Sequence, residues 1–209
     1  MIIQPTNHSV PRIAIQSIAG GLLLMAFFTM VWAGIASGGL AGFGQYAVLF
    51  VFGVPAGMFV ACSISLFRAS RGFPPLTSSA DKAEGKRMGI WYGIIFGAEG
   101  ITIPIVCGFL VYFRQTAFIL PAIALVIGLH FYPMARIFKR TIDYYLATWT
   151  CLVAFSAIAA IKNNILPQNT IYALLGMGVA VATTGYGLYM IYEGKRLVGS
   201  GDQRLEIRD

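Results

Sequence analysis

Apolar residues fall into six long runs, and short polar segments separate each run from the next. A helix rises about 1.5 Å per residue, so about 20 apolar residues cross the roughly 30 Å hydrocarbon core of a bilayer. Continuous runs of this length favour helices over a β-barrel, whose shorter strands would alternate apolar and polar residues. We therefore predict an all-α polytopic membrane protein, a single domain in which six transmembrane helices form a bundle. The predicted spans cover residues 13–36, 43–67, 89–113, 117–138, 144–161 and 170–192.

The polar segments define the connections between these spans. The longest covers residues 68–87, and the prolines within residues 73–75 exclude a helix there because proline lacks a backbone N–H donor. The sequence of residues 78–81 is typical of a helix N-terminus, so we predict a short polar helix that starts there and continues directly into the third span. Residues 1–12 and 193–209 are polar or charged and predict two terminal tails, the second charged and disordered.

Composition and charge agree with a membrane setting. Of the 209 residues, 57% are hydrophobic and only 11% are charged, against about a quarter charged in soluble domains. The net charge of +7 comes from residues between the apolar runs, which favours a role in topology over a nucleic-acid surface. With six spans, all but two of the 15 Lys and Arg residues lie on the side of the two termini, the exceptions being Arg114 and Lys162. Because such residues concentrate in cytoplasmic segments, we predict that both termini face the cytoplasm.

Glu99 is the only carboxylate within the six predicted spans. Ionisable residues inside a membrane are costly, and they usually face the bundle interior and mark ion or proton paths. His130 lies in the next span, which runs in the opposite direction. Counted from the end of each span on the side of the termini, the two residues lie at depths of about 15 Å and about 12 Å. We therefore predict a contact between Glu99 and His130.

Three interpretations of this pair remain open. A histidine beside a carboxylate can exchange a proton near neutral pH, which favours a proton or ion relay. Alternatively, Glu99 is protonated and structural, bonded to a backbone carbonyl freed by a proline; Pro104 would free that of Gly100, and Pro133 that of Leu129. A third interpretation is a ligand-binding site.

Other polar residues and helix breakers lie at similar depths. Tyr92 and Thr102 share approximately one helical face with Glu99, so we predict a polar seam along the third span. Pro55, Pro104 and Pro133 predict helix breaks, and a site between broken helices is typical of transporters. Residues 183–186 form a second polar patch.

Glycine pairs with GxxxG spacing predict close helix packing and allow a homo-oligomer. These pairs are Gly34/Gly38, Gly53/Gly57 and Gly93/Gly97.

Other chemistries lack the residues they require. The three cysteines lie in separate apolar runs without a CxxC motif, and the chain has only two histidines, so we predict no metal site. Hydrolase, nucleotide-binding and metalloprotease motifs are missing from the sequence, so we predict neither an enzyme nor a cofactor. The expected partner is the lipid bilayer, and the sequence does not identify a small-molecule or ion substrate.

The segment Gly128-Leu129-His130-Phe131-Tyr132-Pro133-Met134-Ala135-Arg136 resembles a segment of small, uncharacterised bacterial multispanning membrane proteins. The resemblance implies a multi-pass protein of the bacterial inner (plasma) membrane, and it implies no particular activity. Our leading hypothesis is a small proton-linked transporter or channel that uses Glu99 and His130. The rival hypothesis is a non-catalytic membrane subunit or sensor in which the two residues are structural.

Overall fold

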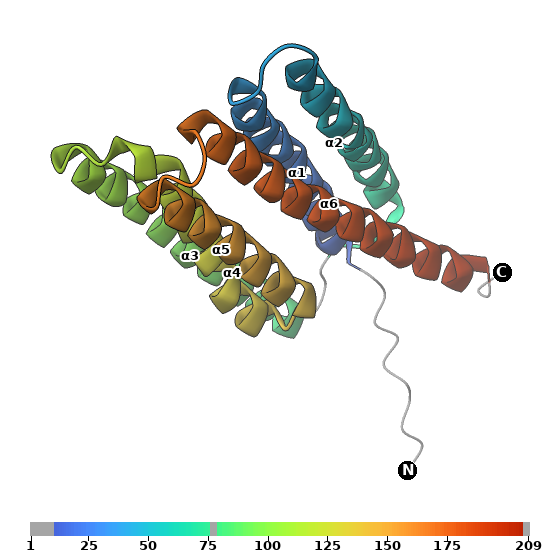
Figure 1. The fold of residues 1–209 in the computed structure, drawn as a ribbon. Helices are drawn as coiled ribbons and strands as arrows, with labels where there is room; N and C mark the ends of the chain where they lie inside the picture. Colours follow the sequence, from blue (N-terminus) through green and yellow to red (C-terminus); the bar gives the residue numbers. More distant parts are fainter. Residues whose placement is uncertain (1–10, 76–78, 207–209) are drawn as a thin grey trace.

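The computed structural model describes residues 11–75 and 79–206, and this part of the chain is helical (Figure 1). Six of its helices are long and apolar enough to cross a membrane. The architecture is therefore that of a multi-pass membrane protein, as predicted. The α-helices are α1 (Arg12–Gly38), α2 (Phe43–Ala69), α3 (Ser79–Tyr112), α4 (Ile119–Phe138), α5 (Thr141–Lys162) and α6 (Gln168–Glu206). Two short 3-10 helices are η1 (Ser70–Gly72), after α2, and η2 (Thr116–Phe118), before α4.

Helix boundaries confirm some predictions and correct others. Residues 73–75 are not helical, and α3 starts at Ser79 and continues through the polar residues into its apolar stretch, as predicted. The predicted N-cap at Ser78 and most of the N-terminal tail lie outside the described residues. The predicted C-terminal tail is wrong in part, because α6 continues to Glu206, and an ion pair of 3.2 Å between Glu193 and Arg196 links neighbouring turns of it.

The three prolines predicted as helix breaks lie within helices. Pro55, Pro104 and Pro133 lie inside α2, α3 and α4, and each helix continues on both sides of its proline. A proline removes one backbone hydrogen bond, and a long membrane helix tolerates this loss because its other backbone bonds remain. Each of the three helices is therefore assigned as one continuous element.

The helices form two groups (Figure 1). In the first, α1 packs against both α2 and α6, with a hydrogen bond of 2.7 Å from Ser63 of α2 to the carbonyl of Ala19 in α1. In the second, α4 packs between α3 and α5. The groups meet mainly where α5 contacts α6, and Trp149 there donates a hydrogen bond of 2.8 Å to the carbonyl of Gly178. The last helix in sequence thus joins the first two.

Glycine allows the closest helix contacts, although not at the predicted pairs. A Cβ atom added to Gly176 of α6 would lie 2.7 Å from the backbone nitrogen of Ala36 and 2.7 Å from the carbonyl oxygen of Trp32, both in α1. None of the six glycines in the predicted GxxxG pairs has a non-neighbouring atom within 4 Å of such a Cβ. Those pairs therefore do not pack helices together in this chain, because they lie on faces that no described helix covers.

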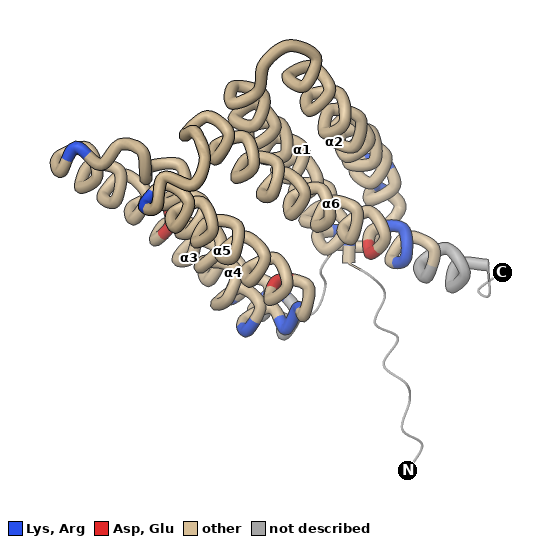
Figure 2. Tube along the Cα trace, viewed as in Figure 1, with Lys and Arg blue, Asp and Glu red and all other residues tan. Residues whose placement is uncertain are grey.

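Exposure differs strongly between the helices. In the apolar stretch of α3, 6% of the residues are buried inside the protein, against 50% in that of α6. The central parts of the helices carry few charges, and Lys and Arg lie toward helix ends and connections (Figure 2). α3 is thus the least covered helix, and it carries Glu99.

Candidate functional site

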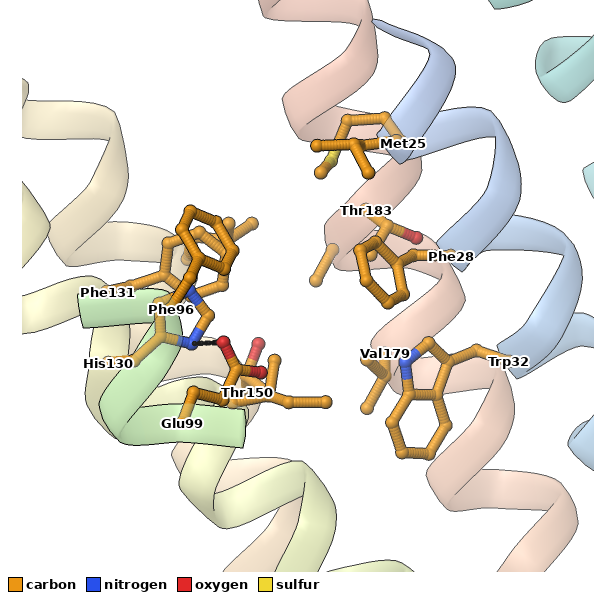
Figure 3. A pocket seen from close by; sticks show the side chains of 14 residues that line it. Met25, Phe28, Trp32, Phe96, Glu99, His130, Phe131, Thr150, Val179 and Thr183 are labelled. Carbon is orange, nitrogen blue, oxygen red and sulfur yellow. Dashed lines mark ion pairs between the residues drawn. The ribbon is translucent and has the colours of Figure 1, made fainter. Parts of the chain in front are cut away.

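Glu99 and His130 lie side by side on α3 and α4 (Figure 3). The short connection of residues 113–118 makes these helices antiparallel neighbours, and Glu99 is at the centre of the apolar stretch Gly85–Tyr112. Oε2 of Glu99 is 3.5 Å from Nδ1 of His130. The two side chains are 13% and 10% exposed. The structure thus brings together the two ionisable residues that the sequence places at similar depth.

Aromatic rings hold the imidazole ring of His130. Phe131 lies 4.2 Å from it between ring centroids, and Phe96 lies 5.7 Å away. Nδ1 of His130 is buried and has no hydrogen-bond partner, since its contact with Glu99 does not meet hydrogen-bond geometry. Imidazole and carboxylate can each bind a proton, so the two groups together form a site that can hold and exchange one.

The pair borders a cavity of about 50 Å³ between the two helix groups. In Figure 3, Glu99, His130 and Phe96 face Phe28, Trp32 and Thr183 across this space. A cavity of this size has room for a few water molecules. Its lining is mainly apolar, with few polar side chains besides the pair. The lining residues are Leu24, Met25, Phe28, Trp32, Phe96, Glu99, Ile127, His130, Phe131, Leu146, Thr150, Val179, Ala182 and Thr183.

Two threonines fix the far wall of this cavity. Thr29 of α1 donates a hydrogen bond of 2.9 Å to the hydroxyl oxygen of Thr183 in α6, and Thr183 donates one of 3.1 Å to the carbonyl of Ala180. Both threonines are buried. The hydrogen bonds hold α1 and α6 at a fixed rotation, so that the wall opposite Glu99 keeps its shape.

Replacing Thr183 with valine is expected to destabilise the protein by about 1 kcal/mol, because the shape is kept and the buried hydrogen bonds are lost. Thr184→Val is the matched control, since the hydroxyl of Thr184 is buried without a hydrogen-bond partner. That variant should be neutral or stabilising. Thermal unfolding in detergent would measure both. Equal destabilisation of the two variants would contradict a role for the Thr29–Thr183 bond.

Two predicted members of the polar seam lie elsewhere. Tyr92 stacks on Phe138 with ring centroids 4.2 Å apart and on Phe96 at 6.0 Å, and it does not line the cavity. Thr102 is exposed on the surface of α3. It follows Glu99 by three residues, so its side chain points about 60° away from that of Glu99 around the helix axis.

The sequence analysis missed a second buried carboxylate, that of Asp143. The predicted fifth span began at Tyr144, whereas α5 begins at Thr141 and includes Asp143, whose exposure is 0%. Nearby, Arg140 donates a long hydrogen bond of 3.5 Å to the hydroxyl group of Tyr186. Had the predicted fifth span started at Thr141, three residues earlier, Asp143 would have been recognised as a carboxylate in the first turn of an apolar helix. Glu99 is therefore not the only carboxylate in the six helices.

Arg140 lies between α4 and α5, outside the apolar stretches of both. Burial lowers the pKa of its guanidinium group, but electrostatic interactions with Tyr92, Tyr186 and Asp143 and the bond to Tyr186 together hold that pKa above its ordinary value. Arg140 thus keeps its positive charge beside the buried carboxylate.

In comparisons with known proteins, no family model, no curated protein and no solved structure matched this chain. The functional assignment therefore depends on the residues of the chain itself.

Proposed function

We propose that this protein moves protons across a bilayer, alone or coupled to a solute, with Glu99 and His130 as its intramembrane proton-binding pair. The observation that supports this most directly is the 3.5 Å contact between the two side chains at the edge of a cavity between two groups of helices. A buried carboxylate in an apolar helix costs several kcal/mol when ionised, so such residues usually serve a function.

The cavity favours a proton over a bulky solute. Its volume of about 50 Å³ is well below the roughly 150 Å³ of a dry cavity that binds benzene. A few waters can occupy it, and water can carry a proton to and from the pair. The apolar lining, including Phe28, Trp32 and Phe131, would exclude metal and halide ions, because removing their hydration water costs much free energy.

Exchange with both sides of the membrane requires access from each side in turn. The pair belongs to α3 and α4, and the opposite wall belongs to α1 and α6, so a relative movement of the two helix groups would change that access.

We propose further that both termini face the cytoplasm, from the Lys and Arg distribution, and that the membrane is a bacterial inner membrane, from the resemblance around His130.

Proteoliposomes provide the test. A potassium-diffusion potential should drive proton entry into vesicles with the protein, seen with a trapped pH-sensitive dye, and protein-free vesicles should lack it. Dicyclohexylcarbodiimide, which modifies protonated carboxyl groups in apolar surroundings, should block this flux and label Glu99, as peptide mass spectrometry would show. Flux no greater than in protein-free vesicles would contradict uncoupled proton movement, and pH-gradient-driven uptake from a solute library would then test the coupled form.

A membrane subunit or sensor is the second candidate, favoured by the exposure of α3. Its apolar stretch is almost uncovered, with large side chains such as Ile101, Ile105 and Phe109 exposed. A partner protein or a second copy of the chain could cover this face. Retention of a partner during purification, together with flux that does not depend on Glu99, would favour this function over proton movement.

A further inference from the structure

We propose that Asp143 is a second proton-binding group, placed between the cavity and the Lys- and Arg-rich end of the bundle, and that Tyr186 and Arg140 control its occupancy. This proposal rests on the proposed function, and it concerns a group outside the Glu99–His130 pair.

The state of the Asp143 side chain is unusual. The residue is fully buried, and neither carboxylate oxygen has a partner at full hydrogen-bond geometry. The Tyr186 side chain makes a hydrogen-bond interaction with the carboxylate that falls short of this geometry, and Arg140 interacts with it by its charge. Asp143 forms no direct ion pair among the described residues, and it is not a helix cap. A buried polar group without a partner costs free energy, about 1–3 kcal/mol for a neutral group and more for a charge. A proton or a water molecule would satisfy this carboxylate.

The position of Asp143 connects it with the cavity. It shares the buried face of α5 with Ala147 and with Thr150, which lines the cavity about 10 Å further along the helix. Across from it, Tyr186 follows the cavity residue Thr183 by three residues on α6, about one helical turn. Asp143 and Tyr186 thus form the next layer of side chains beyond the cavity, on the side of the connection between α4 and α5.

Aromatic contacts link the pair to this layer. The ring of Phe131 lies 4.2 Å from that of His130 and 6.1 Å from that of Tyr186, measured between centroids. Phe131 lines the cavity, whereas its neighbour Tyr186 does not. Rotation of this side chain would bring cavity water next to the Tyr186 hydroxyl group, so that Phe131 is placed to act as the barrier between the two proton sites.

The titratable groups that interact with Asp143 come from two elements. Tyr186 belongs to α6, and Arg140 belongs to the connection before α5; α4 contributes none. Tyr92 of α3 interacts with Arg140. One fixed positive charge therefore faces one buried carboxylate, and this charge offsets part of the free-energy cost of ionising Asp143 in a buried position.

The transfer conserves protons and charge. The N–H bond of protonated His130 breaks, cavity water carries the proton, and an O–H bond forms on a carboxylate oxygen of Asp143. When that O–H bond breaks in turn, the proton leaves to water at the Lys- and Arg-rich end and Asp143 again faces Arg140. No oxidant or other reactant is needed.

Asp143→Asn in proteoliposomes is the decisive experiment. Asparagine keeps the shape and cannot bind the proton, so proton flux should fall about tenfold, since removing a positioned proton acceptor costs at least that much in rate. Asp143→Glu should retain most of the flux because it keeps the carboxylate. Glu193→Gln is the control, as that carboxylate lies seven residues beyond Tyr186 on α6, in an ion pair with Arg196. Unchanged flux in Asp143→Asn, with active wild-type vesicles, would overturn this proposal and leave the Glu99–His130 proposal intact.

Infrared difference spectra provide a readout independent of flux. On titration of the detergent-solubilised protein, one protonated-carboxyl band should vanish in Asp143→Asn and a different one in Glu99→Gln. The Asp143→Asn substitution should also shift the titration midpoint of the Glu99 band. If wild-type vesicles show no proton flux, uncoupled proton movement fails, and the spectra still decide about Asp143. Lack of a titrating Asp143 band, or of the midpoint shift, would overturn its role as a second proton-binding group.

Discussion

Replacing Glu99 with glutamine is expected to lower proton flux by about 100-fold, because a positioned acid–base group typically contributes at least that much to the rate of proton transfer. Glutamine has nearly the same size, so the cavity and the contact with His130 should persist. The substitution removes a buried ionisable group and should leave thermal stability unchanged or raised. Flux into proteoliposomes and unfolding in detergent measure the two effects separately.

Two further variants sharpen this experiment. Glu99→Asp keeps a carboxylate but withdraws it from His130 by one methylene group, so its flux should lie between those of wild type and Glu99→Gln. Glu193→Gln removes an exposed ion pair with Arg196 and should retain wild-type flux. Unchanged flux in Glu99→Gln would instead assign Glu99 and His130 a structural role and favour the membrane subunit or sensor.

Replacing Gly176 with alanine is expected to destabilise the fold by about 2 kcal/mol, the usual cost of overpacking a well-packed contact. The added methyl group would lie 2.7 Å from backbone atoms of Ala36 and Trp32, and backbone cannot rotate aside as a flexible side chain can. α1 and α6 would have to separate, which also displaces Trp32 and Thr183 from the wall of the cavity. Thermal unfolding in detergent and the yield of folded protein measure the effect.

Gly185→Ala is the matched control on the same helix. A Cβ at that position has no non-neighbouring atom within 4 Å, and alanine is favoured over glycine in a helix by about 1 kcal/mol. This variant should therefore unfold at the same temperature as wild type or at a higher one. If Gly176→Ala behaves like Gly185→Ala, α1 and α6 are not in the close contact that the structure describes.

The sequence predicted the helices well because crossing a bilayer sets a minimum length for an apolar run. It also placed Glu99 and His130 at similar depth on neighbouring helices, because a short connection between two spans makes α3 and α4 lie side by side and antiparallel. In both cases the information is local: a run length, a short connection and a count of residues from an end.

The remaining features depend on contacts between distant segments. The packing of α6 against α1 joins Gly176 with Trp32, and no pattern within either helix specifies that partner. The GxxxG pairs failed as a guide for the same reason, since spacing does not indicate which face another helix covers. Asp143 escaped notice because it is three residues into α5, where a small error in the helix start decides whether a carboxylate counts as buried.

The sparse cover of α3 has a mechanical consequence. This helix contacts the rest of the protein along one edge, mainly through α4, whereas α1 and α6 are held by tight backbone contacts and buried hydrogen bonds. Displacing α3 therefore breaks fewer interactions than displacing any helix of the first group, and elements with few buried contacts open at the lowest free energy. Glu99 belongs to the helix that is displaced at the lowest free-energy cost, whereas α1 and α6, which form the opposite wall of the cavity, stay in place. The Glu99 carboxylate would then move together with α3, and its distance from the wall formed by α1 and α6 would change.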